Sequence, residues 1–143
     1  MKYLLDTNIC IYIMNKCPVA VIERCRQCEP GEIGISVVTL SELQYGVSKS
    51  DQRTKNKIRL DDFLVPFEIL AYDHGAANVY GDIRFQLEKK GTPIGPLDML
   101  IAAQAISRDI TLITNNEKEF KRIKKLKVEN WILVQKMTTM DMK

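Results

Sequence analysis

Histidine and long apolar runs are both scarce in this 143-residue sequence. No uncharged run approaches the roughly 18 residues of a membrane-spanning helix, and Asp6 interrupts the first apolar run before the core of a signal peptide could form. The one histidine, His74, lies far from the cysteines, and the Cys25-x-x-Cys28 pair has no second close pair beside it. These absences argue against a membrane protein and a structural zinc site, and they predict a cytoplasmic protein with reduced cysteines.

The composition is that of a globular protein. Hydrophobic residues make up 45% of the chain and charged residues 27%, proportions that exclude an intrinsically disordered protein. The length suits one domain with its own core. We therefore expect a single domain over residues 1–134 and a flexible tail over residues 135–143.

Basic residues gather in two stretches, although the formal net charge is only +3. One stretch is "KEFKRIKKLK", residues 118–127, and the other is "KSDQRTKNKIR", residues 49–59. Many charged runs are merely solvated faces. Two of them on one small domain favour a polyanionic partner.

Short apolar runs alternate with helical patterns along the chain. The predicted strands are Lys2–Leu5, Glu32–Val38, Phe67–Tyr72, Ile110–Thr114 and one within Lys127–Val134. The predicted helices cover residues 9–15, 19–28, 39–47, 51–64 and 73–90, and one more begins at Pro96. Strands separated by helices predict an α/β fold with a mostly parallel central sheet of four to five strands, flanked by helices.

Acidic residues stand where the predicted strands end or helices begin. Asp6 closes the first strand, Glu42 is placed in the first turn of the helix after the second strand, and Asp98 in the first turn of a later helix. Asn116 and Glu119 follow the fourth strand. Ligands of such sheets bind beyond the carboxyl ends of the strands. Carboxylates gathered there repel one another, and Mg²⁺ or Mn²⁺ relieves that repulsion.

Each of these residues also has a purely structural interpretation. Asp98 follows Pro96 and suits the first turn of a helix, where the dipole favours an acid. Thr39-x-x-Glu42 has the pattern of a capping box. Asp6 is a candidate helix N-cap, and Asn116 a candidate turn residue.

Four motifs in order resemble those of PIN-domain ribonucleases and, more narrowly, of VapC toxins from type II toxin–antitoxin systems. They are "LLDTN", "TLSELQYG", "GTPIGPLDMLIAAQA" and "TLITNNEKEF", and the similarity runs from Lys2 to about Trp131. The resemblance implies a Mg²⁺-dependent endoribonuclease that is inhibited by a cognate VapB-like antitoxin. It also implies a homodimer and, as the RNA substrate, a tRNA.

The resemblance carries the family's acidic positions onto Asp6, Glu42 and Asp98. A fourth position, often Asp in the family, falls on Asn116, and Glu119 is the candidate for the missing carboxylate. The expected metal ligands are thus Asp6, Glu42, Asp98 and Glu119, and the expected catalytic residues are Asp6, Glu42, Asp98 and Asn116. The expected RNA-binding residues are Thr7, Thr114, Lys118, Lys121 and Arg122.

Two other functions remain open at this point. One is a PIN nuclease that acts in RNA processing and not as a toxin. The other is a non-catalytic RNA-binding domain on the same scaffold. This alternative stays open because an amide, Asn116, stands at the family's fourth acidic position.

Overall fold

The protein is built on one parallel sheet. The computed structural model describes residues 1–16 and 18–132, so the predicted tail at 135–143 lies outside the described residues. The five strands are ordered β3-β2-β1-β4-β5, and every neighbouring pair is parallel. They are β1 (Tyr3–Leu5), β2 (Ile33–Ser36), β3 (Glu68–Leu70), β4 (Thr111–Ile113) and β5 (Val128–Glu129). The predicted α/β fold is confirmed.

The central strands are apolar on both faces because helices cover both. Successive side chains of a strand point to opposite faces. Leu4 and Leu112, paired in register, belong to one buried cluster, whereas Leu5 and Ile113, the next pair, belong to another. A strand with no solvated face reads as a continuous apolar run, as "YLL" and "TLI" do.

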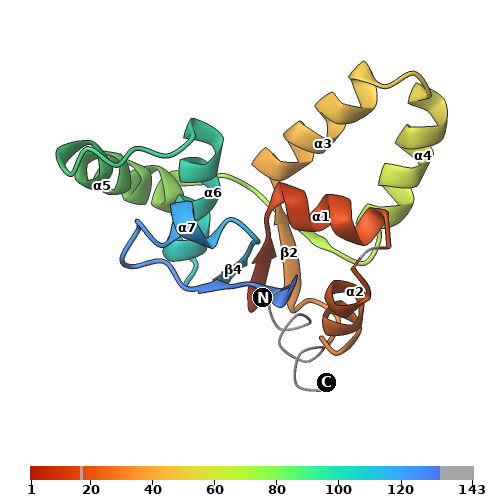
Figure 1. Cartoon of the computed structure of the whole chain (residues 1–143), viewed down its shortest axis with the longest axis horizontal. Coiled ribbons are helices and arrows are strands. Elements are labelled where there is room, and N and C mark those ends of the chain that lie inside the picture. The colour runs from red at the N-terminus through yellow and green to blue at the C-terminus, as the bar shows by residue number, and fades with distance from the viewer. Residues whose placement is uncertain (17, 133–143) are drawn as a thin grey trace, which may run out of the picture.

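The helices form two groups, one on each side of the sheet (Figure 1). One group is α1 (Thr7–Met14), α2 (Val19–Arg26), α3 (Val37–Lys49) and α4 (Arg53–Leu64). The other is α5 (His74–Lys89), α6 (Pro96–Ser107) and the short α7 (Glu117–Phe120). Across residues 1–16 and 18–132, none of the helices combines the length and apolar character needed to span a membrane.

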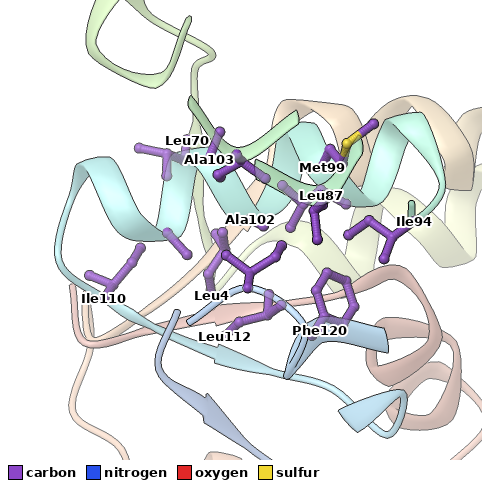
Figure 2. Close-up of a cluster of buried hydrophobic side chains, with 14 residues drawn as sticks. Leu4, Leu70, Leu87, Ile94, Met99, Ala102, Ala103, Ile110, Leu112 and Phe120 are labelled. Atoms are coloured by element: carbon purple, nitrogen blue, oxygen red, sulfur yellow. The ribbon is translucent and has the colours of Figure 1, made fainter. Parts of the chain in front are cut away.

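Helix α6 anchors the second group. Its residues Met99 and Ile101 to Ala105 are buried, and they pack with sheet residues and with Ile83 and Leu87 of α5. Figure 2 shows Met99 and Ala102 of α6 in the same cluster as Leu4 of the sheet. Pro96 is the first residue of the helix and fixes its entry. The apolar run thus holds the first turn of α6 in a rigid position.

Two predicted helix starts next to the site are wrong: α1 begins at Thr7 and not at Ile9, and α3 also begins earlier than expected. Strand β2 ends at Ser36, and α3 begins at Val37, two residues before the expected start at Thr39. The Ser36 side chain accepts a hydrogen bond from the Val38 N–H at 2.9 Å and so caps the helix. Thr39 is therefore inside the helix, and the capping box with Glu42 does not form.

The cysteines that the structure describes are all free. Cys10 is buried, and Cys25 and Cys28 are partly buried on α2 and just after it. Burial raises the pKa of the Cys25 thiol to about 12. These thiols therefore stay protonated and pack as small apolar groups.

Candidate active site

Asp6 joins the ends of the two central strands. It follows β1 and begins α1, and its Oδ1 accepts from the Ile9 N–H at 2.9 Å as an N-cap. Its Oδ2 accepts from the hydroxyl of Thr114, the residue after β4. Asp6 is only 5% exposed, so its carboxylate is held in one place.

Glu42 lies in the second turn of α3, not in the first as predicted. Its Oε1 accepts from the Thr7 hydroxyl at 2.7 Å. Thr7 is the first residue of α1 and follows Asp6 directly. The hydrogen bond therefore brings the Glu42 carboxylate from α3 to the start of α1.

Asp98 is the third residue of α6, in the first turn as predicted. Its side chain is half-buried. In the part of the chain that the structure describes, no side chain or backbone group donates a hydrogen bond to its carboxylate. This carboxylate is thus placed by the helix and left available.

Glu119 is oriented by Asn116. Thr114 is buried, and its Oγ1 accepts from the Asn116 N–H at 2.9 Å while its hydroxyl donates to Asp6. The Asn116 side-chain amide donates to Glu119 Oε2 at 2.8 Å. The chain after β4 therefore connects the buried Asp6 to Glu119 through two hydrogen-bonding side chains.

The four acids share one electrostatic environment. Burial raises the pKa of Asp6 to about 6, and the charges of Asp98 and Glu42 act in the same direction, against the hydrogen bonds from Thr114 and Ile9. Partial burial also raises the pKa of Asp98 to about 6, and the charges of Glu42 and Glu119 add to it. Within residues 1–16 and 18–132, no lysine, arginine or histidine forms a salt bridge with any of the four. Negative charge accumulates here without a cation.

The side chains do not form a ready metal site as they lie. Over the described ranges, no three histidine, cysteine, aspartate or glutamate residues are arranged to hold a metal ion. Glu42 is turned to Thr7, Glu119 to Asn116, and both oxygens of Asp6 are engaged. The donor chemistry still fits a hard divalent cation, because the groups at this edge are carboxylate and hydroxyl oxygens. The ligand set stays a prediction.

Comparisons with known proteins agree with this geometry. The family model of the PIN domain matches residues 3–126. Ribonuclease VapC2 of Rickettsia felis is 47% identical over 132 residues, which is 92% of this chain and 98% of the relative. The tRNA(fMet)-specific endonuclease VapC of Shigella flexneri is 41% identical over 131 residues, again 92% and 98%. The chain belongs to the PIN-domain family, among the VapC ribonucleases.

Solved structures of VapC proteins share the fold. DNA-bound VapBC from Salmonella typhimurium superposes with a TM-score of 0.87 at 40% identity, over 92% of this chain and 98% of that one. VapBC2 from Rickettsia felis, bound to a DNA fragment from its promoter, gives 0.85 at 46% identity, over 92% and 99%. The predicted resemblance is confirmed. PIN-domain nucleases generally depend on a divalent metal, in accord with the acidic residues at the carboxyl edge of this sheet.

The predicted RNA-binding residues of this chain are of two kinds, threonine hydroxyls and basic side chains. Thr7 and Thr114 donate to Glu42 and Asp6, so their hydroxyls position acids. Lys118 and Lys121 are exposed on and just after α7. Arg122 donates to the Pro93 carbonyl at 2.9 Å.

One buried polar pair was not predicted from the sequence. The Ser36 hydroxyl donates to Gln104 Oε1, and Gln104 Nε2 donates to the Leu70 carbonyl at 3.1 Å. Both side chains are buried, and their hydrogen bonds connect the carboxyl ends of β2 and β3 to α6. The signal was present, because Gln104 is a polar residue within the apolar run "MLIAAQA".

Proposed function

We propose that this chain is the toxin of a type II toxin–antitoxin pair, an endoribonuclease that hydrolyses RNA phosphodiester bonds with Mg²⁺, or with Mn²⁺ in its place. The observation that carries the proposal is the group of four acids without a cationic partner at the carboxyl edge of the sheet, in a chain of the VapC family. This group of acids does not suit a domain that only binds RNA, because uncompensated carboxylates repel the RNA backbone.

Asp6, Asp98, Glu42 and Glu119 are the residues that would hold the cation. When bound, a divalent ion polarises the scissile phosphate and lowers the pKa of a water that attacks it. The chain supplies the position of each ligand: the cap at Ile9 and the Thr114 hydroxyl hold Asp6, and the first turn of α6 holds Asp98. Glu42 is the candidate to orient the attacking water and accept its proton, since its second oxygen is not used by Thr7.

Asn116 acts as a positioning residue in this proposal. Its amide donates to Glu119 Oε2, and an amide carries no charge of its own for the cation. The family's fourth carboxylate is in this way replaced by an amide that fixes one oxygen of Glu119, whose charge acts on Asp98. Asn116 therefore contributes to catalysis through Glu119.

The proposed substrate is a tRNA cut in an exposed single-stranded segment. The VapC of Shigella flexneri, 41% identical, is named a tRNA(fMet)-specific endonuclease. Loops of folded RNA expose both the backbone and the bases to a protein surface. Lys118, Lys121 and Arg122 stand beside Glu119 on the chain and are placed to bind flanking phosphates.

The proposed partners are a VapB-like antitoxin and a second copy of the chain, in the cytoplasm. Structures similar to this one are VapBC complexes from Salmonella typhimurium and Rickettsia felis. A basic antitoxin side chain that reached Asp6 and Asp98 would take the place of the metal charge. Inhibition of this kind weakens when that antitoxin residue becomes alanine.

A metal titration with Asp98→Asn tests the proposal. We expect the wild-type chain to cut tRNA only with added Mg²⁺ or Mn²⁺, and the variant to lose at least about a thousandfold in rate with its fold intact, because the change removes charge but not shape. Cleavage by Asp98→Asn at the wild-type rate, or full wild-type cleavage in a chelator, would contradict the metal site. Sequencing RNA 5′ ends after brief expression then identifies the cut.

A further inference from the structure

A cavity with a positively charged rim lies on the α5–α6 side of the molecule, outside the acidic site. It has a volume of about 580 Å³ and is enclosed by α5, the end of α6 and the segment after α7. Its apolar surface includes Ile83, Leu87 and Ile123, and its basic lining residues are Lys90, Arg122, Lys124 and Lys125. Of the acids in the described residues, only Asp82 lines it.

The cationic groups on this rim are not neutralised. None of the salt bridges within residues 1–16 and 18–132 involves Lys90, Arg122, Lys124 or Lys125. Lys90, the C-cap of α5, and Lys124, from the segment after α7, line the same cavity and lie close enough for their charges to interact. The charge of Lys124 is the main cause that lowers the pKa of Lys90. Two ammonium groups that repel one another are a favourable place for an anion.

The cavity adjoins the acidic site along the chain and in space. The Arg122 N–H donates to the backbone carbonyl of Glu119 at 3.1 Å. Arg122 therefore lies one turn after the residue whose carboxylate charge acts on Asp98. The Arg122 guanidinium donates to the Pro93 carbonyl at 2.9 Å, in the loop that leads into the first turn of α6. The Arg122 side chain therefore connects the loop before α6 to the cavity that it lines together with Lys90 and Lys124.

We infer that this basic cavity is a phosphate-binding exosite for the RNA substrate, in which Lys90 and Lys124 share one backbone phosphate away from the bond that is cut. The inference rests on the proposed RNA substrate and adds a second contact to it. Charge complementarity favours nucleic acid as the occupant, because the rim carries four cations and one acid. An acidic protein segment is the competing occupant, and the experiment separates the two.

A structural explanation for Lys90 must be controlled. Lys90 is the C-cap of α5, where the helix dipole favours any cation. Lys89 is at the same helix end but does not line the cavity. Arg26 is an exposed basic residue in the last turn of α2, on the other side of the sheet and outside both basic stretches. The pair Arg26 and Lys89 is therefore a matched control with the same loss of charge at helix ends.

The test compares K90Q/K124Q with R26Q/K89Q in the full chain. In the cleavage-deficient D98N background, fluorescence anisotropy measures the Kd of a labelled tRNA over a range of salt concentrations. We expect K90Q/K124Q to weaken binding by about tenfold and to reduce the slope of log K against log salt by roughly one, and the control to change Kd less than about twofold. In the active background, kcat/KM should fall by the same factor, with kcat nearly unchanged.

Each other outcome has a defined meaning. Equal effects of the two double variants, or no binding of tRNA by the D98N parent, would overturn the exosite. If cleavage is normal and only the exosite comparison fails, the proposed function stands. If the wild-type chain cuts no RNA but K90Q/K124Q alone loses tRNA binding, the exosite stands and the nuclease proposal falls. Unchanged tRNA affinity with weakened antitoxin binding would assign the cavity to a protein partner and overturn the inference.

Discussion

The starts of helices α1 and α5 are capped in the same way. Asp6 accepts a hydrogen bond from the N–H three residues on, at 2.9 Å, and Asp73 does the same at 2.9 Å. Both residues have extended backbone geometry and follow a strand of the sheet. As N-caps the two aspartates are equivalent, and each stabilises its helix by about 1 kcal/mol.

Their surroundings differ in every other respect. Asp6 is buried, bonded to Thr114, and close enough to Asp98 and Glu42 for their charges to act on it, whereas Asp73 is exposed. Capping therefore does not explain why Asp6 is held among other acids. Asp6 thus combines its role as a helix cap with the catalytic role that we propose for it. Its second carboxylate oxygen, which accepts from Thr114, sets it apart from Asp73, which accepts only from a backbone N–H.

The rate of RNA cleavage should distinguish Asp6 from Asp73 completely. Asn is as good an N-cap as Asp, so Asp6→Asn and Asp73→Asn should both keep their helices. We expect Asp6→Asn to lower the rate of RNA cleavage by at least about a thousandfold, because it removes charge from the proposed metal site. Asp73→Asn should cleave like the wild type. The measurement is single-turnover cleavage of tRNA with saturating Mg²⁺, and equal rates for the two variants would remove Asp6 from the site.

Glu42 tests whether a hydrogen-bonded acid also needs its charge. In Glu42→Gln the side-chain oxygen can still accept from Thr7, so thermal stability should change by less than about 0.5 kcal/mol. The rate of cleavage should fall by about a hundredfold, since glutamine neither holds a cation nor accepts a proton. Glu68→Gln, at an exposed position on β3, is the control. Unaltered turnover would give Glu42 a structural role only.

The pH dependence of metal-free stability should also distinguish Asp6 from Asp73. Burial raises the pKa of Asp6 from its ordinary value of 3.8 to about 6, so the folded state binds the proton more tightly than the unfolded chain does. The contribution of Asp6 to the free energy of unfolding is then largest below about pH 4 and is lost as pH rises towards about 6, by at most about 3 kcal/mol.

Chemical denaturation in a chelator measures this loss. Asp6→Asn should remove the part of this loss that comes from Asp6 and leave the part from Asp98, whose pKa is also raised to about 6, whereas Asp73→Asn should keep the whole profile. A divalent cation should restore stability at about pH 8, where the carboxylates are ionised and free to bind it. A wild-type profile that rises between about pH 4 and 6 would show that burial does not dominate the Asp6 pKa.

The sequence predicts the sheet and the placement of Asp6 and Asp98 well because these depend on local patterns, whereas Glu42 lies one turn later in its helix than expected. Apolar runs that end in Asp6 or Thr114 mark buried strands and the residues just beyond them. The first-turn position of Asp98 follows from Pro96. The start of α3 was misplaced because Ser36 and Thr39 both suit an N-cap, and only the tertiary fold, which buries Ser36 against Gln104, decides between them.

The partners of the site residues could not be predicted. Thr7 with Glu42 and Thr114 with Asp6 are pairs 35 and 108 residues apart in the sequence, so their hydrogen bonds depend on the register of strands and helices. Lys90 and Lys124 meet for the same reason, and Lys90 lies in neither basic stretch of the sequence. Residue type identifies a candidate, but the fold determines what it faces.

Thr114 provides the finest test of the difference between a cap and a site. Its hydroxyl lowers the pKa of Asp6, in opposition to burial, and Asp73 accepts only from a backbone N–H. Thr114→Val keeps the shape and removes that hydrogen bond, so the pKa of Asp6 should rise further and less of it should be ionised near neutral pH. We expect cleavage to fall by about tenfold near neutral pH, and the acid limb of the pH–rate profile to move to higher pH.

Activity of Thr114→Val should recover in alkaline buffer, which a simple packing defect would not allow. Thr111→Val, the same substitution at the first residue of β4, should leave the profile in place. A Thr114→Val profile that is lowered equally at every pH would mean that Thr114 supports the fold and does not tune Asp6.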